Sequence, residues 1–229
     1  MKVFFVENRY KGKISLPSGL IKQLPGDIML FASVQYLDMI EHVKARLEQA
    51  GKRVVPGKAR HSKYEFQLLG CGIDKLKGDF NAFLYIGDGN FHPKALVLKN
   101  DKQCFYYNPV SEKYGTILQE DAKIFEKKRK GALAKFLSSK NIGVLLSTKP
   151  GQKAALNVVD ELEKIFPGKM FYLLLSNEII PESLADFSFV EAFVNTACPR
   201  IAYDEQEKFS RPVINIEDVL ELAKTSRKH

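Results

Sequence analysis

A chain of 229 residues is long enough to form one large domain or two small ones. Its composition, with 45% hydrophobic and 27% charged residues, is ordinary for a globular protein and argues against an intrinsically disordered chain. The net charge of +8 would suit an acidic or nucleic-acid-associated partner. It does not require one, because lysines scattered along a chain also form ordinary solvated surface.

The apolar runs are all far shorter than the roughly 18 residues of a transmembrane helix, so we expect no membrane span. The chain begins with a strand-like run, Lys2–Val6, and shows neither the long apolar region nor the small-residue cleavage site of a signal peptide. Three cysteines are a sparse and odd number, which fits a reducing compartment better than a disulfide scaffold. We therefore expect a cytoplasmic protein.

The first half of the chain predicts apolar strands that alternate with an amphipathic helix. The run Ile28–Ala32 predicts a buried strand. In Gln35–Ala50 the apolar residues fall at helical spacing, and Gly51 marks the end of this predicted helix. Further strands are predicted at Arg53–Val55, Ala82–Ile86, Ala95–Leu98 and Cys104–Tyr107.

The second half repeats this pattern after a predicted connecting helix, Asp121–Leu137. Strands are predicted at Ile142–Leu146, Met170–Leu175, Phe189–Val194 and Val213–Asn215, and helices at Ala154–Phe166 and Glu217–Ala223. Such alternation predicts an α/β protein with two small Rossmann-like domains, each a mainly parallel sheet flanked by helices. We expect the first domain at residues 1–118, a connector helix at 119–139 and the second domain at 140–229.

Ligands of parallel α/β sheets bind beyond the carboxyl ends of the strands, and the notable loops of this chain lie there. The first loop, Gly87-Asp88-Gly89-Asn90-Phe91-His92, follows the predicted strand Ala82–Ile86, and its glycines would let the backbone approach a ligand. It is not a dinucleotide fingerprint, because the third glycine is absent and no helix clearly follows. For this loop taken alone, a simple turn between strands is the favoured interpretation, with His92 as a hydrogen-bonded loop residue rather than a metal ligand.

A second loop, Ser147–Gln152, lies between a predicted strand and a predicted helix. Free N–H groups at a helix start attract carboxylates or phosphates, but the glycine spacing of a phosphate loop is missing, so an ordinary turn is equally compatible. The basic run Lys127–Lys130 could contact RNA or an acidic protein. A solvated helix face is the favoured interpretation of that run.

The three cysteines differ in their surroundings. Cys71 and Cys198 lie in turns next to glycine or proline, each at the end of an apolar segment. Cys104 lies in an alternating apolar strand, which is typical of a core residue. No C-x-x-C pair occurs, so neither a zinc knuckle nor a thioredoxin-like site is supported. The spacing does not decide whether Cys71 and Cys198 share a site.

Taken in order, the loops resemble those of the diphthamide synthase family, the 2-(3-amino-3-carboxypropyl)histidine synthases. The resemblance extends from roughly residue 28 to residue 223. It rests on Leu69-Gly70-Cys71, Tyr85–Pro93, Thr148–Gln152, Ala192–Ile201 and Arg211-Pro212-Val213.

In that family, three similar α/β domains each give one cysteine to a 4Fe-4S cluster, and the unique iron binds S-adenosylmethionine. Reductive cleavage yields a 3-amino-3-carboxypropyl radical, which attacks a histidine of translation elongation factor 2. The resemblance implies that Cys71 and Cys198 are iron ligands from the middle and last domains. It also implies an S-adenosylmethionine pocket lined by Gly87, Asp88, Gly89, His92, Lys149 and Gln152. Arg200 and Asp204 would support the loop of Cys198.

One departure from the family pattern is serious, because the first domain and its cysteine have no counterpart in this short form, and Cys104 matches no ligand position. A split enzyme with the first domain on another subunit is one interpretation. A short form that completes its ligands with Cys104, a non-cysteine group or a homodimer mate is the second. A non-catalytic scaffold or S-adenosylmethionine-binding relative is the third, and a nucleotide-binding protein without iron is a generic fourth. Elongation factor 2 is the expected protein partner, with no direct nucleic-acid or membrane contact.

Overall fold

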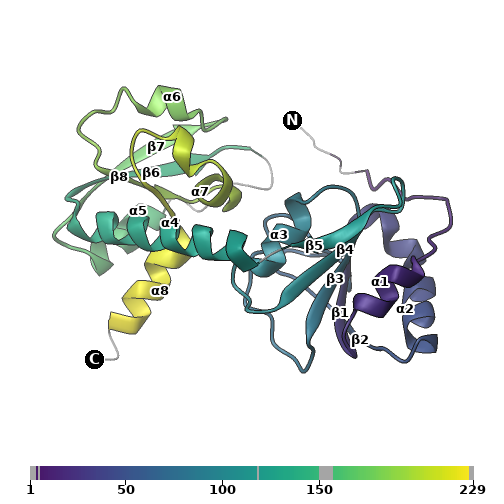
Figure 1. Cartoon of the computed structure of the whole chain (residues 1–229). Helices are drawn as coiled ribbons and strands as arrows, with labels where there is room; N and C mark the ends of the chain where they lie inside the picture. Colours follow the sequence, from purple (N-terminus) through teal and green to yellow (C-terminus); the bar gives the residue numbers. More distant parts are fainter. Residues whose placement is uncertain (1–3, 5, 118, 150–156, 227–229) are drawn as a thin grey trace. The chain divides into compact units, whose positions relative to one another are not determined.

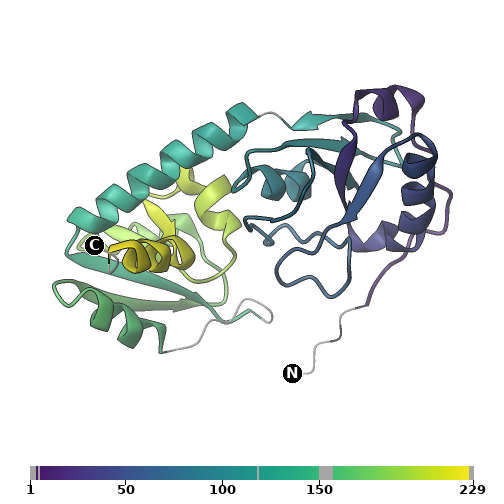
Figure 2. The ribbon, with the colours of Figure 1, turned by 90° about the horizontal axis from the view of Figure 1, so that it is seen from below.

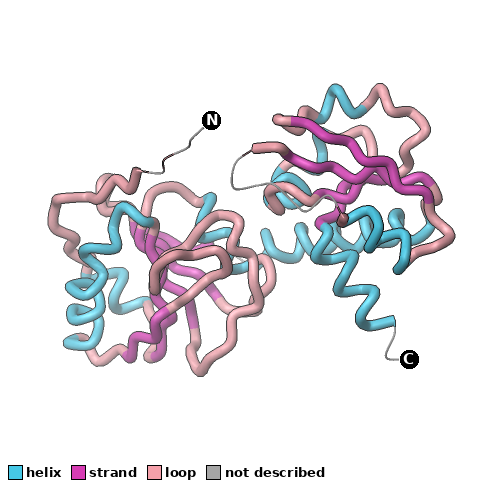
Figure 3. Tube along the Cα trace, turned by 180° about the vertical axis from the view of Figure 1, so that it is seen from behind, coloured by secondary structure: helices cyan, strands magenta, loops and turns pink. Residues whose placement is uncertain are grey.

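The computed structural model describes residue 4 and residues 6–117, 119–149 and 157–226. The chain folds into two compact units, Met1–Ile124 and Phe125–His229, and each is a separate α/β structure (Figure 1). The boundary falls inside helix α4 (Gln119–Ser138), in the region where the sequence predicts a connector. In both units the strands form one layer with helices beside it (Figure 3).

The sheet of the first unit has the strand order β2-β1-β3-β4-β5. Its strands are β1 (Asp27–Ala32), β2 (Arg53–Pro56), β3 (Ala82–Ile86), β4 (Gln103–Tyr107) and β5 (Tyr114–Ile117). The first four are parallel, and β5 pairs with β4 in the antiparallel direction. Every residue of β3 is buried, as expected for a parallel strand that helices cover on both faces.

Helices α1 (Ser18–Gln23) and α2 (Ile40–Gln49) lie on one face of this sheet (Figures 1 and 2), with the 3-10 turn η1 (Val34–Met39) leading into α2. Their buried residues share one core cluster with the side chains on that face of the strands. Helix α3 (Phe91–Val97) contributes to a second cluster on the opposite face. This arrangement leaves the carboxyl ends of β1, β3 and β4 free to carry loops.

Helix α3 corrects two predictions. The run Ala95–Leu98 was predicted as a strand, but Ala95–Val97 forms the last turn of the helix and Leu98 follows it. A helix therefore does follow the Gly87–Gly89 turn. All four residues of the run are buried, so the run has no polar side from which a helical period could be read.

The second unit has the strand order β7-β6-β8-β9, and all three pairings are parallel. Its strands are β6 (Asn141–Ser147), β7 (Met170–Ser176), β8 (Ala192–Asn195) and β9 (Val213–Asn215). Helices α4, α5 (Val158–Ile165) and α8 (Ile216–Ser226) contribute to the core on one face. The other face packs against α7 (Arg200–Asp204), α6 (Pro181–Leu184) and the residues around the 3-10 turn η2 (Gln206–Lys208).

The predicted fold class is confirmed, since both units are mainly parallel sheets flanked by helices. The predicted helix Ala154–Phe166 is described only from residue 157, where α5 follows Asn157; residues 154–156 lie outside the described part of the chain. Among the described residues, no helix combines the length and the apolar character needed to cross a membrane.

Candidate functional site

Cys71 lies in the long loop between β2 and β3. Backbone hydrogen bonds join this loop to the carboxyl end of β1. Residues 66–68 run alongside that end: Ala32 N–H donates to the Phe66 carbonyl at 2.7 Å, and Leu68 N–H donates to the Ala32 carbonyl at 2.9 Å. The turn around Cys71 is closed by Gly72 N–H, which donates to the Leu69 carbonyl at 2.9 Å. The Cys71 side chain is half-buried.

The Gly87–Gly89 turn follows β3 at the same edge of the sheet. Gly87 N–H donates to the Tyr107 carbonyl at 3.0 Å, so the turn begins where β3 and β4 end. Gly89 has φ +64°, a conformation that glycine adopts without the strain that a Cβ would bring. A Cβ on Gly87 would lie 2.3 Å from the Tyr85 hydroxyl, so only glycine fits over that ring.

His92 lies in the first turn of α3 rather than in a loop. Its ring stacks on Tyr85 with centroids 6.0 Å apart, and it meets the Phe91 ring edge-on at 5.5 Å. Phe91 in turn packs on the cysteine loop, because a Cβ on Gly70 would lie 2.1 Å from its ring. A continuous set of aromatic contacts therefore joins the Cys71 loop to the Gly87–Gly89 turn.

The Tyr85 hydroxyl is the polar atom under this turn. It is fully buried, and among the described residues it forms no hydrogen bond of good geometry. The nearby Ser33 side chain partly offsets the effect of burial on the pKa of Tyr85. Burial raises the pKa of Tyr85 strongly, with the Asp88 carboxylate as a lesser cause. Burial and the Asp88 carboxylate also raise the pKa of Tyr36.

Cys198 lies in the turn between β8 and α7, and two buried asparagines hold it. Asn195 Nδ2 donates to the Cys198 carbonyl at 2.9 Å and to Asn215 Oδ1 at 2.8 Å. Asn215 Nδ2 donates to the Pro199 carbonyl at 3.1 Å. The turn is fixed by side chains from the carboxyl ends of two adjacent strands, while the Cys198 side chain is half-buried.

Arg200 and Asp204 form an ion pair within α7, with Arg200 Nε 2.6 Å from Asp204 Oδ2. The Arg200 side chain is only 5% exposed, so this pair is largely removed from water. The pair joins the first and last residues of α7, the helix that follows the Cys198 turn. Support of the Cys198 loop by these two residues stays a prediction.

Lys149 follows β6, next to β8 in the sheet, so it lies at the same carboxyl edge as Cys198. Its N–H donates to Ser147 Oγ at 3.1 Å, and its ammonium forms an exposed ion pair with Glu178 at 3.2 Å. Gln152, the other predicted residue of this loop, lies outside the described residues.

Cys104 is a core residue. It is fully buried, and burial raises the pKa of its thiol strongly. It pairs with Phe83 in the body of the sheet, whereas the carboxyl edge is reached at Tyr107, opposite Ile86. The expectation of a core position is confirmed, and a role as a third ligand beside the turn cysteines has no support in the first unit.

The basic run 127–130 is largely neutralised on α4. Lys128 pairs with Glu207 at 2.6 Å, Arg129 with Glu126 at 2.8 Å, and Lys130 with Glu126 at 3.8 Å. Arg129 also reaches the buried carboxylate of Asp218 at 3.4 Å. These pairs favour a solvated helix face that is tied to its own unit.

The donor chemistry of the chain amounts to one half-buried turn thiol in each unit. Within the described residues there is no cluster of three or more His, Cys, Asp or Glu side chains that could hold a metal ion. Two thiolates fit part of the ligand set of an iron–sulfur cluster, which normally takes a cysteine at most of its irons.

Sequence reasoning missed the residues that fix both turns. Asn195 and Asn215 directly follow or end apolar strands, and buried asparagines there could have been read as turn supports. The contact between Gly70 and Phe91 joins residues far apart in the sequence, so no local pattern could predict it.

Comparison with known proteins gives a consistent result. A family model described as "Putative diphthamide synthesis protein" matches residues 1–228. The 2-(3-amino-3-carboxypropyl)histidine synthase of Methanocaldococcus jannaschii is 36% identical over 166 residues, which cover 71% of this chain and 47% of that protein. The Pyrococcus horikoshii enzyme of the same name is 30% identical over 205 residues, covering 88% and 58% of the two chains. Subunit 1 of the Kluyveromyces lactis synthase is 31% identical over 195 residues, covering 82% and 45%.

Solved structures show similarity to the same family. The crystal structure of Dph2 from Pyrococcus horikoshii with a 4Fe-4S cluster superimposes with a TM-score of 0.72 at 29% identity, covering 90% of this chain and 60% of that one. Another crystal structure of Dph2 from Pyrococcus horikoshii gives a TM-score of 0.74, covering 92% and 62%. This chain spans about half the length of the curated relatives it matches.

Proposed function

Because this chain belongs to the diphthamide synthesis family, we propose that it takes part in transferring a 3-amino-3-carboxypropyl group from S-adenosylmethionine to a histidine of translation elongation factor 2. The observation that carries this proposal is the contrast among the three cysteines. Cys71 and Cys198 are half-buried in supported turns at the carboxyl ends of strands, whereas Cys104 is fully buried in the core. Two thiols therefore lie at the carboxyl edges of the sheets, where parallel α/β folds bind their ligands, and the third thiol does not.

In this proposal Cys71 and Cys198 are two ligands of a 4Fe-4S cluster. When bound, such a cluster would supply the electron that cleaves S-adenosylmethionine and releases the 3-amino-3-carboxypropyl group. The chain's own part is to present both thiolates from fixed turns. The Asn195 and Asn215 amides hold the backbone of the Cys198 turn, and the Phe91 ring supports the Cys71 loop.

By resemblance to the family, we assign contacts with S-adenosylmethionine to the Gly87–Gly89 turn of the first unit and to the loop after β6 of the second unit. Gly87 and Gly89 leave the backbone open to close approach, and the exposed Asp88 carboxylate would attract the ammonium group of S-adenosylmethionine. Lys149 would meet the carboxylate of the same amino-acid moiety. Its ion pair with Glu178 is exposed on both sides, so exchanging that partner costs little. Gln152 is assigned to the same loop by resemblance alone.

The third cluster ligand is proposed to come from a separate subunit that supplies the first domain of the family. The position of Cys104 in the sheet leaves it unsuited to this role. A second copy of this chain is the competing source. We place the reaction in the cytoplasm, since none of the three cysteines, all of them described, forms a disulfide.

A non-catalytic role, as a scaffold or an S-adenosylmethionine-binding relative without a cluster, is the second candidate. The observation that favours it is that the described residues hold no metal-binding group of three ligands. A subunit of that kind would keep the turns and the pocket and leave the chemistry to its partner.

Anaerobic reconstitution with iron and sulfide tests the proposal. Iron is counted, and EPR spectra of the dithionite-reduced protein are recorded with and without S-adenosylmethionine. We expect a cubane signal that the cofactor shifts, and a loss of iron in Cys71→Ser and in Cys198→Ser. Cys104→Ala is the matched control and should keep its iron. Full iron in both turn variants would overturn the cluster assignment.

Adding a family member's first domain separates the sources of the third ligand. If the chain alone binds little iron and the mixture binds a full cluster, the separate subunit is supported. A full cluster in the chain alone, with a dimer as the reactive species, supports a second copy. If neither preparation binds iron but S-adenosylmethionine still binds, the scaffold is the better description. Transfer of label from the cofactor to elongation factor 2 then tests the substrate.

A further inference from the structure

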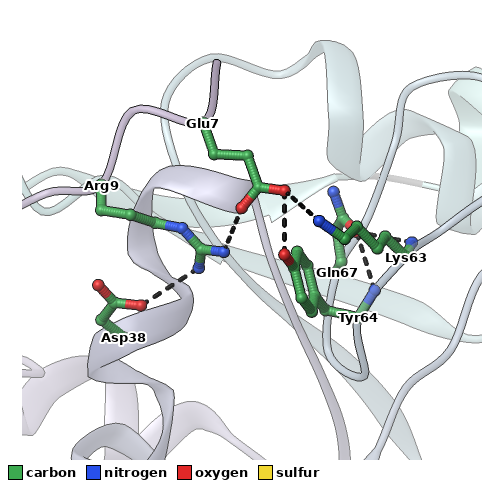
Figure 4. A network of polar contacts seen from close by, with 6 residues as sticks. All are labelled: Glu7, Arg9, Asp38, Lys63, Tyr64 and Gln67. Carbon is green, nitrogen blue, oxygen red and sulfur yellow. Dashed lines mark hydrogen bonds and ion pairs between the residues drawn. The ribbon is translucent and has the colours of Figure 1, made fainter. Parts of the chain in front are cut away.

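An N-terminal segment, Glu7–Tyr10, fastens the loop that carries Cys71 (Figure 4). The Glu7 carboxylate accepts from Lys63 Nζ and from the Tyr64 hydroxyl, both at 3.0 Å. Its other oxygen accepts from Arg9 at 2.6 Å. The contacts with Lys63 and Tyr64 join residues more than fifty positions apart in the sequence.

The segment is itself fixed to the body of the first unit. Arg9 donates to Asp38 at 3.2 Å, and Tyr10 N–H donates to the Gln35 carbonyl at 2.7 Å. The Tyr10 ring packs on Tyr36 with centroids 5.3 Å apart. Residues 7–10 therefore bridge the region after β1 and the outer side of the Cys71 loop.

Inside the loop, a buried glutamine organises the turn that Glu7 holds. Gln67 is 7% exposed, and its side-chain oxygen accepts from Lys63 N–H at 2.8 Å and from Tyr64 N–H at 3.1 Å. Its backbone carbonyl accepts from the Ser62 hydroxyl at 2.7 Å. The turn is thus held from inside by Gln67 and from outside by Glu7, as Figure 4 shows.

This turn carries two residues in the left-handed backbone region. His61 has φ +64° and Phe66 has φ +61°. Residues with a Cβ are disfavoured there, so the surrounding contacts must hold them in that conformation. A turn of this kind is expected to relax when its outer contacts are removed.

The residues that lead into this turn contact the chain close to Cys71. Gly72 packs on an earlier segment of the loop, because a Cβ on it would lie 3.1 Å from the Ala59 side chain and 3.3 Å from the Arg60 carbonyl. Arg60 N–H donates to the Asp74 carboxylate at 3.0 Å. Residues 59 and 60, directly before the turn, therefore contact the segment that directly follows Cys71.

We propose that Glu7 and Tyr64 are positioning residues for Cys71. Their contact holds a strained turn, and the turn holds the backbone on which the Cys71 thiol is presented. The relevance of this position to iron rests on the proposed function. The positioning itself is a property of the apo chain and can be measured without any cluster.

The test is the rate at which iodoacetamide alkylates each cysteine of the apo full-length chain, resolved by peptide mass spectrometry. Cys198, in the other unit, is the internal reference. In Glu7→Gln and in Tyr64→Phe we expect the Cys71 rate to rise roughly three- to ten-fold relative to Cys198, as the loop opens more often. The double variant should add little to Glu7→Gln, because Tyr64→Phe removes only one of the three contacts that Glu7→Gln already weakens.

Asp27→Asn is the matched control. It removes an Arg–carboxylate pair, with Arg53, at the amino end of β1, the opposite edge of the same sheet. We expect no change at Cys71 in this variant, whereas amide exchange in residues 57–72 should speed up only in the two test variants. An unchanged Cys71 rate in both test variants would overturn the proposal, as would an equal rise in Asp27→Asn.

The two proposals fail in different ways. If the Cys71 rate rises as expected but no preparation binds iron, the positioning role stands and the cluster assignment fails. If iron binds through Cys71 and the rate does not respond to Glu7→Gln, the cluster assignment stands and the positioning role fails.

Discussion

The turns that carry Cys71 and Cys198 lie at the same kind of sheet edge but are held in different ways. Cys198 comes three residues after β8, and its supports, Asn195 and Asn215, are the last residues of β8 and β9. Cys71 lies far along the loop between β2 and β3, and its supports come from the N-terminal segment and from α3. One turn is held by its own strands, and the other by distant parts of its unit.

This difference has an energetic consequence. The contacts of the Cys198 turn are buried, so losing one leaves polar groups without partners in a place that water does not reach. Many contacts of the Cys71 loop are exposed, and water can replace them. Changes near Cys198 should therefore reduce global stability, whereas changes near Cys71 should mainly alter local order.

The largest effect is expected for Arg200→Met. The side chain of Arg200 is buried and paired with Asp204, so its removal leaves a carboxylate that is only 27% exposed without its partner. We expect a loss of about 3 kcal/mol in the free energy of unfolding, measured by urea denaturation followed by circular dichroism. Arg53→Met removes a half-exposed arginine from a similar pair in the first unit, and it should have a much smaller effect. Equal losses in the two variants would show that burial of the arginine does not determine the cost of losing its ion pair.

Asn195→Ala should come next. It removes the amide that donates to the Cys198 carbonyl and to Asn215, and the oxygen that accepts from Ala197 N–H at 3.1 Å. We expect a loss of about 2 kcal/mol, because buried partners are left unsatisfied. Asn157→Ala, which removes an exposed contact with Glu161, is the control and should be close to neutral. A neutral Asn195→Ala would mean that the strands alone fix the turn.

Gly70→Ala tests the Cys71 loop directly. The added Cβ would lie 2.1 Å from the Phe91 ring, so either the ring or the loop must move. We expect a loss of about 1 kcal/mol together with faster alkylation of Cys71. Gly26→Ala, where nothing lies within 4 Å of the added Cβ, is the control, and Phe91→Leu should rescue Gly70→Ala. If the rescue fails, Phe91 is not the support that the geometry indicates.

The sequence predicts the strands better than the supports of the site, for a physical reason. Runs such as Ile28–Ala32 and Ile142–Leu146 carry the continuous apolar character of buried parallel strands, and both are strands in the structure. Ala95–Leu98 has the same character but belongs mainly to α3, since burial on all sides removes the period that distinguishes a helix from a strand. The short antiparallel β5, which contains Gly115, was not predicted at all.

In the candidate site, too, local patterns could be predicted from the sequence, whereas contacts between distant residues could not. Its residues could be placed at the carboxyl ends of strands from local patterns, and Cys104 could be assigned to the core. The contact of Glu7 with Lys63 and Tyr64 could not be predicted, because it depends on how the loop folds back over the end of β1. Whether the assigned residues bind a cluster and S-adenosylmethionine stays a prediction.

The smallest effect expected is a local response of the Cys71 loop to acid. The contacts from Arg9, Lys63 and Tyr64 lower the pKa of Glu7 from an ordinary 4.5 to about 2, and Asp38 faces Glu7 only through Arg9. A depressed pKa means that the contribution of Glu7 is complete above pH 4.5 and is lost as the pH falls toward 2. Amide exchange in residues 57–72, corrected for its intrinsic pH dependence, should show this loss, and a carboxyl NMR titration should locate the pKa.

Two comparisons sharpen this last prediction. In Glu7→Gln the exchange of the loop should be fast at every pH and should lack the transition below pH 4.5. In the second unit, the backbone N–H groups of Asn141 and Lys140 lower the pKa of Glu191, so acid should loosen the start of β6 there as well. The Cys198 turn lies at the opposite end of that sheet and should not respond, because Asn195 and Asn215, the side chains that bond to its backbone, are neutral amides. An acid response at Cys198 equal to that at Cys71 would remove the distinction between a turn held by its strands and a loop held by a charged segment.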